Sequence, residues 1–282
     1  MGTHKTAHHY DRLDRFYRHL WGEHVHHGLW DDPSWAPERA VRHLVHAVAR
    51  DAHLQAGDQV VDIGCGYGAP ARLWAGAYGA QVIGFTVSKA QATVARRREN
   101  KGAGPTPEIR LQNIRENTLP DASADAVVAV ESLTHIDSPA WGLSEAARLL
   151  RPGGRLVACV WMAAPCVPPW AQRYLLDPIV EEGRLAALPT ATTLHRWTTA
   201  AGLTVKRLDD RTADVRRTWS VVLTRLAWAL LTDAETRRLL LDPTESERVF
   251  ARTVPRIWCA HHLGILRYGW LVAQKPSTRP AR

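Results

Sequence analysis

The segment VVDIGCGYG at residues 60–68 constrains the fold of this chain more than any other feature. An apolar run ends in Asp62 and leads directly into three glycines at every second position, Gly64, Gly66 and Gly68. Glycine allows the backbone to take left-handed conformations and to pass close to a ligand. A glycine-rich turn between a strand and a helix is where a doubly wound α/β sheet binds nucleotide-like ligands. The segment therefore predicts a binding loop, and a ligand-free strand-to-helix turn is the alternative.

The spacing of these glycines narrows the choice of ligand. Dinucleotide-binding loops follow the pattern GxGxxG, which brings a pyrophosphate to the N-terminus of the next helix. This chain instead has D-x-G-x-G-x-G. The tighter loop favours a ligand that presents an amino-acid and ribose portion over one that presents a pyrophosphate.

Apolar strands and helices alternate on both sides of this loop. The expected strands are 59–63, 81–85, 108–112, 124–131 and 154–161, and the expected helices are 38–55, 69–78, 89–100 and about 139–150. Near-continuous apolar strands joined by helices predict a parallel sheet that is covered on both faces. Ser88 and Gln91 fit a capping box at the start of the helix at 89–100.

The pattern changes after residue 161. Helices are expected at 171–185 and 191–201, and strands at 203–208 and 264–274. The helical pattern between these two strands is long enough to cap the active-site edge of the sheet. The chain is therefore expected to divide into an N-terminal flap (1–37), a core (38–161), the end of the core with a helical connection (162–208), a helical cap (209–263), and a last strand with its tail (264–282).

Composition excludes several classes of protein and leaves an ordinary globular chain. The net charge is +8, but the basic residues form no block, so most of them are expected to be solvated, with an anionic partner as the minor interpretation. The four cysteines lack CxxC spacing and indicate reduced thiols. No apolar run has the length of a membrane span or the form of a secretion signal. We therefore expect a cytoplasmic protein with no membrane partner.

Several segments together resemble the class I S-adenosylmethionine-dependent methyltransferases: VVDIGCGYG, residues 81–91, ESLTHID (131–137) and LLRPGGRLV (149–157). WGEHVHHGLW and GFTVSKAQ are more similar to the branch that holds γ-tocopherol, sterol and rebeccamycin-type natural-product methyltransferases. The resemblance covers about residues 10–161 and the final strand, and is less specific over 162–263. It implies an α/β fold with a doubly wound, mostly parallel, seven-stranded Rossmann-like sheet. It also implies S-adenosylmethionine as cofactor and S-adenosylhomocysteine as product.

The resemblance implies roles around the glycine loop. Asp62 and the three glycines would line the methionine and ribose part of the cofactor. Many members place an acidic ribose ligand after the second strand, but this chain has Thr86 and Val87 there. Thr86 and the downstream Gln91 match the tocopherol-like branch, so Gln91 is expected to bind ribose, to cap its helix, or both.

The remaining cofactor contacts follow from the same resemblance. Asn113 stands where an aspartate usually receives the adenine amino group, and its carbonyl oxygen can accept that bond. Ile114 would supply a backbone N–H and an apolar face to the ring. Tyr10 and Trp21 in the flap are candidate clamps over the cofactor.

ESLTHID contains the candidate catalytic residues. Glu131 would either line the cofactor pocket or act as a base. His135 could take a proton from a hydroxyl or amine because its ordinary pKa is near neutral pH, and a histidine that only starts a helix is the structural alternative. Rebeccamycin-type enzymes carry a second acidic residue after the fifth strand, and this chain has Trp161 in that region, so a His–Asp pair is not expected.

Histidines and tryptophans suggest further sites. His24, His26 and His27 are spaced wrongly to share one ligand on a helix, and no set of four ligands surrounds them, so no metal is expected. Most of the 12 tryptophans should be core. Trp30 in the flap and Trp219 and Trp258 in the cap are the candidates for an aromatic substrate cavity.

The sequence thus predicts a methyltransferase for a small, largely apolar or aromatic metabolite, with O-, N- and C-methylation unresolved. An isoprenoid-diphosphate C-methyltransferase is the first alternative, because arginine binds diphosphate in a bidentate way. A nucleic-acid methyltransferase would suit a pI near 9.7, but no basic stripe or base-flipping motif accompanies it. A cofactor-binding protein without catalysis is a third class. A homo-oligomer is possible, because an aromatic flap can be exchanged between subunits.

Overall fold

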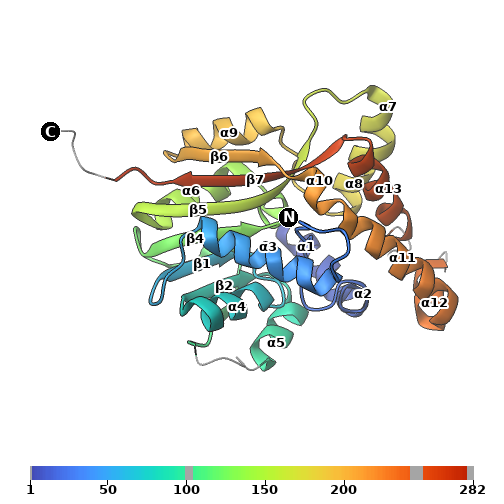
Figure 1. Cartoon of the computed structure of the whole chain (residues 1–282), viewed down its shortest axis with the longest axis horizontal. Helices are drawn as coiled ribbons and strands as arrows, with labels where there is room; N and C mark the ends of the chain where they lie inside the picture. Colours follow the sequence, from blue (N-terminus) through green and yellow to red (C-terminus); the bar gives the residue numbers. More distant parts are fainter. Residues whose placement is uncertain (1, 99–103, 242–249, 278–282) are drawn as a thin grey trace.

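The protein is built on one seven-stranded sheet, seen in a computed structural model that describes residues 2–98, 104–241 and 250–277 (Figure 1). The strand order is β3-β2-β1-β4-β5-β7-β6. Strands β1 to β5 pair in parallel, and β7 is antiparallel to both of its neighbours. The strands are β1 (Gln59–Ile63), β2 (Gln81–Thr86), β3 (Glu108–Leu111), β4 (Ala124–Val130), β5 (Leu150–Ala163), β6 (Thr204–Asp210) and β7 (Leu266–Gln274). The expected doubly wound, mostly parallel sheet of seven strands is confirmed.

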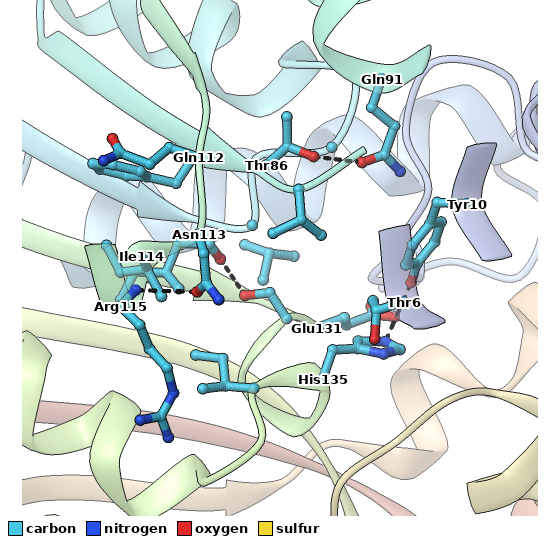
Figure 2. Close-up of a pocket in the computed structure, with 18 of the residues that line it drawn as sticks. Thr6, Tyr10, Thr86, Gln91, Gln112, Asn113, Ile114, Arg115, Glu131 and His135 are labelled. Carbon is cyan, nitrogen blue, oxygen red and sulfur yellow. Dashed lines mark hydrogen bonds between the residues drawn. The ribbon is translucent and has the colours of Figure 1, made fainter. Parts of the chain in front are cut away.

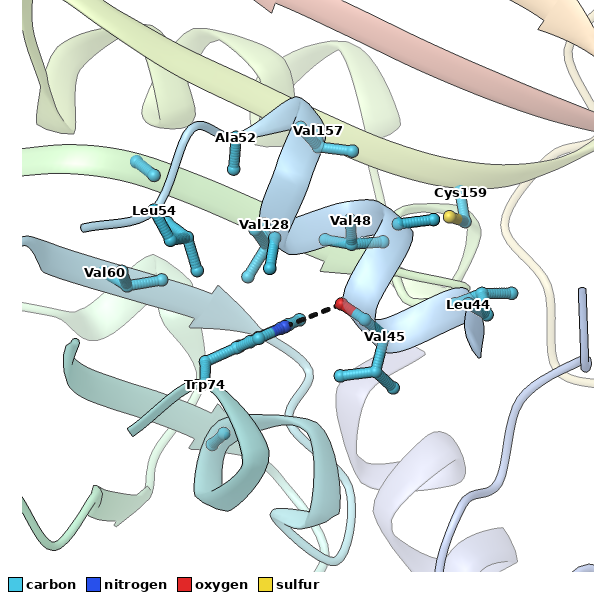
Figure 3. Packing of buried hydrophobic residues seen from close by; sticks show 14 of the residues in the cluster. Leu44, Val45, Val48, Ala52, Leu54, Val60, Trp74, Val128, Val157 and Cys159 are labelled. Atoms are coloured by element: carbon cyan, nitrogen blue, oxygen red, sulfur yellow. Dashed lines mark hydrogen bonds between the residues drawn. The ribbon is translucent and has the colours of Figure 1, made fainter. Parts of the chain in front are cut away.

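One face of the sheet is covered by α3 (Pro37–Asp51), α4 (Ala69–Tyr78) and α5 (Lys89–Arg97). Helix α3 presents Leu44, Val45 and Val48 to alternate residues of the central strands, such as Val128 and Val157 (Figure 3). Trp74 of α4 is fully buried, and its Nε1 donates to the carbonyl of Val45 at 2.9 Å. This bond satisfies the polar atom of a large core side chain and joins the two helices.

The opposite face is covered by α6 (Pro139–Leu149) and α9 (Ala191–Ala200). Strand side chains that point to this second face, such as Val127 and Leu156, pack against fully buried leucines: Leu143 and Leu149 of α6 and Leu194 of α9. Because the central strands are buried on both faces, the sheet is a closed middle layer. Ligands therefore have access only at its edges and ends.

A second hydrophobic cluster lies beyond the carboxyl ends of the parallel strands. The flap there contains α1 (Gly2–Arg12) and α2 (Asp14–Leu20). Six further elements lie on the same side: α7 (Pro169–Ala171), the π-helical turn η3 (Gln172–Leu176), α8 (Asp177–Glu182), α10 (Thr212–Val215), α11 (Arg217–Thr232) and α13 (Phe250–His262). Leu13 and Leu20 pack with Trp219, Val222 and other cap residues in this cluster. Flap and cap therefore share one apolar core. Figure 1 shows their helices gathered at the same end of the sheet.

Local boundaries differ from expectation at several elements. Helix α3 ends at Asp51 and α5 ends at Arg97, while residues 99 and 100 of the expected helix 89–100 lie outside the described residues. The predicted helix 171–185 is interrupted by η3, and α8 ends at Glu182. Strand β5 begins at Leu150, directly after α6, where it pairs with Ala124 of β4. It runs to Ala163 because β7 pairs with it from Arg155 to Ala163. Helix α12 (Ala234–Leu241) follows α11, while residues 242–249 of the expected helical pattern lie outside the described residues. In the described part of the chain, no helix has both the length and the apolar character to cross a membrane.

Only one of the two hydrogen bonds of the predicted capping box is present at the start of α5. Ser88 Oγ accepts from the backbone N–H of Gln91 at 3.1 Å, as expected for an N-cap. The Gln91 side chain does not return to Ser88 and pairs with Thr86 instead. The backbone N–H of Ser88 donates instead to Thr86 Oγ1 at 3.3 Å. Asp11 of the flap adds a further acceptor at this helix start, because its Oδ1 accepts from Ser88 Oγ and from the backbone N–H of Ala90.

Candidate active site

The main pocket lies where β1, β2 and β4 end, under the flap (Figure 2). It holds about 850 Å³ of space, part of it open to solvent. Its wall is lined by Thr6, Tyr10, Val25, Ile63, Gly64, Gly66, Phe85, Thr86, Val87, Gln91, Gln112, Asn113, Ile114, Arg115, Val130, Glu131, Ser132, His135, Ile136 and Asp137. Ten of the predicted site residues are in this wall, so segments far apart in the sequence do converge at one place.

All three glycines of the loop have left-handed backbones, and two of them, Gly64 and Gly66, form one side of this pocket. Gly64 has φ +84°, and a Cβ there would lie 2.3 Å from Cβ of Ser132. Gly66 has φ +53°, and a Cβ there would meet nothing within 4 Å. Gly64 is therefore required by the close approach of Ser132, whereas Gly66 leaves open space that a ligand can occupy. Gly68 starts α4 with φ +69° and is outside the pocket wall.

Thr86 and Gln91 form the neutral polar pair of the pocket. Thr86 Oγ1 donates to Gln91 Oε1 at 2.8 Å, and both side chains are buried. Because the amide oxygen of Gln91 accepts this bond, the amide NH2 group can donate to a ribose hydroxyl. Nearby, Asn113 Oδ1 accepts from the backbone N–H of Arg115 at 3.0 Å (Figure 2).

Asp62 lies behind the loop and outside the pocket wall. It is 2% exposed, and its Oδ2 has no hydrogen-bond partner among the described residues. Burial raises the pKa of Asp62 to about 7. Asp62 therefore does not face the pocket, and it can affect a bound ligand only through the glycine loop.

His135 has a defined tautomer. A carbonyl can only accept, so the contact between His135 Nδ1 and the carbonyl of Arg184 at 3.4 Å assigns the proton to Nδ1. Nε2 is then an acceptor, and the hydroxyl of Tyr10 lies 3.2 Å from it (Figure 2). Burial lowers the pKa of His135, although the Arg184 carbonyl acts in the opposite direction. The side chain is therefore a neutral imidazole with its basic nitrogen toward the pocket.

Glu131 is occupied by four protein donors. Its carboxylate accepts from the backbone N–H of His27 at 2.7 Å, from His27 Nδ1 at 2.9 Å, from Tyr268 at 2.8 Å and from Trp161 Nε1 at 3.1 Å. Burial alone would raise the pKa of Glu131, but the contacts with His27 outweigh it and lower the pKa to about 2. The backbone at Glu131 is left-handed, with φ +56°, which is uncommon for a non-glycine residue. Glu131 is thus an ionised anchor rather than a base.

A second cavity, here called the aromatic chamber, adjoins the main pocket across Tyr10, Val25, Glu131 and His135, which line both. It holds about 630 Å³ of space. Its other lining residues are Tyr17, Trp21, His26, His27, Trp161, Ile179, Gly183, Leu185, Trp219, Thr253 and Ile257. Among the described residues that line it there is no lysine or arginine, so the chamber is suited to an apolar or aromatic group.

The three predicted substrate tryptophans have different positions. Trp219 lines the aromatic chamber, and its Nε1 donates to His27 Nε2 at 2.6 Å. Trp30 lines a separate hollow between α2, α3 and α11, with its Nε1 3.3 Å from Thr218 Oγ1. Trp258 stacks on His262 and donates to Ser220, and it is not among the lining residues of either site cavity. Of the three, only Trp219 is brought to the site.

Sequence reasoning missed several lining residues. Ser132 and Gln112 were adjacent to predicted positions, so extending each motif by one residue finds them. Tyr268 and Trp161 belong to strands whose order in the sheet decides which side chains meet Glu131. Nothing in their local sequence marks these two residues.

The pocket fits S-adenosylmethionine on its own chemistry. The open cradle at Gly66 suits a close backbone approach, Gln91 offers a neutral donor to ribose, and Phe85 and Ile114 offer apolar faces to a base. The glycine loop of this doubly wound sheet together with such a pocket defines a class I S-adenosylmethionine-dependent methyltransferase.

Comparison with known proteins is consistent with this class. The family described as mycolic acid cyclopropane synthetase matches residues 2–233. The chain therefore belongs to this family. The cyclopropane synthase MmaA2 from Mycobacterium tuberculosis has the same fold, with a TM-score of 0.85, 20% identity, and coverage of 97% of this chain and 98% of that one.

Two curated relatives act on different atoms. 27-O-demethylrifamycin SV methyltransferase of Amycolatopsis mediterranei is 39% identical over 157 residues, which is 55% of this chain and 58% of that protein. Dimethylglycine N-methyltransferase of Parasynechococcus marenigrum is 35% identical over 203 residues, 71% of each chain. The chain thus spans little more than half the length of the first relative, and these names leave the methylated atom open.

Proposed function

We propose that this protein transfers a methyl group from S-adenosylmethionine to a small, largely apolar or aromatic metabolite of natural-product biosynthesis. The observation that carries this proposal is the aromatic chamber, which shares a wall with the cofactor pocket and has no lysine or arginine in its lining. When bound, S-adenosylmethionine supplies a methyl group already activated by its sulfonium. The protein then has to position the acceptor and exclude water.

In this proposal His135 is the general base for a hydroxyl or amine acceptor. It is neutral, its Nδ1 proton is held by the Arg184 carbonyl, and its Nε2 lies at the boundary between the two cavities. Tyr10 donates to the same nitrogen, so an acceptor that replaces the tyrosine hydroxyl there can lose its proton to His135. Glu131 takes no proton, because its four donors keep it ionised.

The isoprenoid-diphosphate alternative receives less support from the lining. A diphosphate needs cationic partners, and the chamber offers the carboxylate of Glu131 instead. The nucleic-acid alternative would need an exposed basic track, but many arginines are paired with carboxylates, as in Arg148 with Glu145 and Asp121. The small-molecule proposal requires neither a diphosphate site nor a basic track.

The test is a labelled-methyl transfer assay against a panel of phenols, amines and polyketide alcohols. His135→Ala should lower turnover by about 10²-fold or more while S-adenosylhomocysteine affinity changes by less than about threefold. Tyr10→Phe, which removes only the hydroxyl, serves as the matched comparison. Normal turnover by His135→Ala would remove His135 from the mechanism. Transfer to no small acceptor, with transfer to RNA or DNA, would overturn the proposal itself.

Two wider expectations belong to the same proposal. A cytoplasmic site of action is supported by four free cysteines, of which Cys65 and Cys159 are buried. A homo-oligomer remains a proposal, and sedimentation velocity at several concentrations tests it.

A further inference from the structure

Two aspartates of the flap bind the two loops that would hold the cofactor. Asp14 Oδ1 accepts from the hydroxyl of Tyr67 at 2.7 Å, and Tyr67 lies inside the glycine loop between Gly66 and Gly68. Asp11 Oδ1 accepts from Ser88 Oγ at 2.6 Å and from the backbone N–H of Ala90 at 2.9 Å. Each bond thus joins a carboxylate of the flap to a loop at the end of β1 or β2.

Burial and charge strengthen these hydrogen bonds. Tyr67 is 2% exposed, so its hydroxyl would lose its hydrogen-bond partner in a buried position if Asp14 moved away. Asp11 adds a charged acceptor to the N-terminus of α5, where backbone N–H groups and the helix dipole favour negative charge. Glu23, farther along the flap, forms an ion pair with Arg98.

The flap also builds a large part of both cavities. Thr6, Tyr10 and Val25 line the cofactor pocket. Six flap residues line the aromatic chamber: Tyr10, Tyr17, Trp21, Val25, His26 and His27. Without a docked flap, the chamber would lack one wall and His135 would lack Tyr10.

We propose that Asp11 and Asp14 are positioning residues that fasten the flap to the two cofactor-binding loops and so hold in place the flap wall shared by the cofactor pocket and the aromatic chamber. Because Thr6, Tyr10 and Val25 of the flap line the cofactor pocket, a ligand bound there and a firmly held flap stabilise each other. This inference rests on the proposed function of the same site.

The release rate of S-adenosylhomocysteine tests the inference without an acceptor. In stopped-flow experiments that follow tryptophan fluorescence, Asp11→Ala and Asp14→Ala should each speed release about tenfold, because each removes charge-assisted bonds to a cofactor loop. Tyr67→Phe removes only the hydroxyl and should speed release in the same direction. The Asp14→Ala/Tyr67→Phe double variant should be no faster than Asp14→Ala alone, because Asp14→Ala already breaks the bond to the Tyr67 hydroxyl, together with the bonds from Arg18 to Asp14 Oδ2.

Conservative and surface variants separate positioning from general damage. Asp11→Asn keeps an acceptor oxygen, and its release rate should stay within about threefold of wild type. His8→Ala changes an exposed residue of the same helix and should leave release unchanged. Tyr67→Phe, Asp11→Asn and His8→Ala leave no buried donor without a partner, so their unfolding midpoints should be close to wild type before ligand is added.

Hydrogen exchange supplies an independent readout. S-adenosylhomocysteine should slow amide exchange across residues 6–27 in wild type, and by much less in Asp11→Ala and Asp14→Ala. Wild-type release rates and wild-type protection in both alanine variants would overturn the inference. A wild-type protein that binds no S-adenosylhomocysteine would instead overturn the proposed function, so the two failures are distinct.

Discussion

Individual residues of this site are defined by what surrounds them more than by their type. Glu131 and Asp62 are both buried acids at strand ends, yet one has four donors and the other has an orphan oxygen. The pKa of Glu131 is accordingly lowered to about 2, and that of Asp62 is raised to about 7. Only the first is a fixed negative charge at neutral pH.

Gly66→Ala tests the cradle at residue scale. The new methyl group would enter space that belongs to the ligand, so S-adenosylhomocysteine affinity should fall at least about tenfold by calorimetry. The left-handed backbone adds a destabilisation of ~1 kcal/mol. Gly202→Ala, at φ +82° and far from the pocket, is the matched control and should keep full affinity. Equal affinity in both variants would contradict the assignment.

Asp62 carries a pH prediction. The pKa of an aspartate in the unfolded chain is about 4. The folded protein therefore binds the extra proton between about pH 4 and pH 7, and ionisation destabilises the fold as pH rises through that range. A difference of about three pKa units corresponds to at most ~4 kcal/mol. The free energy of unfolding of Asp62→Asn, relative to that of wild type, should therefore increase from pH 4 to pH 7. A pH-independent difference would show that Asp62 is not buried as a neutral acid.

At the scale of elements, Glu131 is the point where four parts of the chain meet. His27 comes from the flap, Trp161 from β5, Tyr268 from β7 and, through His27 Nε2, Trp219 from α11. An indole N–H only donates and a carboxylate only accepts, so His27 Nδ1 donates to Glu131 and Nε2 accepts from Trp219 in this arrangement. The polar network joins flap, sheet and cap directly beside the acceptor chamber.

Trp219→Phe tests this junction. The substitution keeps an aromatic ring but removes the donor to His27, so the free energy of unfolding should fall by about 1–2 kcal/mol in urea denaturation. Trp228→Phe, on the exposed face of the same helix at 67% exposure, should change it by less than about 0.5 kcal/mol. Similar losses in both variants would argue against a specific role of the Trp219–His27 bond.

Local sequence pattern predicted helices, strands and loops better than it predicted which side chains contact one another. The glycine spacing and the apolar strands led to the sheet and to the glycine loop, because both depend on near neighbours in sequence. Most of the other predicted pocket residues followed from the family resemblance. Tyr268 meets Glu131 only because β7 lies antiparallel beside β5. Asp11 accepts from Ser88 and Ala90 at the start of α5 only because α1 lies against α5. Trp30 and Trp258 could not be separated from Trp219, because all three occur in similar apolar surroundings.

For the whole molecule, the excess of basic over acidic residues is not concentrated at the proposed acceptor site. The aromatic chamber carries Glu131 and no lysine or arginine, while many arginines outside it pair with acids, for example Arg151 with Asp125 and Arg207 with Asp51. The charge of +8 is thus a property of the surface, where it acts on solubility and nonspecific association.

A salt titration tests this separation of surface from site. S-adenosylhomocysteine affinity should change less than about twofold between 50 and 200 mM salt, and added RNA should not compete. A nucleic-acid enzyme would lose RNA affinity steeply over the same range, by about 10³-fold for six or more phosphate contacts. Tight RNA binding with that slope would revive the nucleic-acid alternative.

The most direct test of the account is which nucleoside ligand the turn after β1 binds. Equilibrium dialysis of the wild-type protein against S-adenosylhomocysteine, NAD and ATP compares the three under one condition. The account predicts one saturable site for S-adenosylhomocysteine, weakened in Gly66→Ala, with no comparable binding of the other two. Saturable binding of NAD or ATP at this turn, with none of S-adenosylhomocysteine, would contradict it.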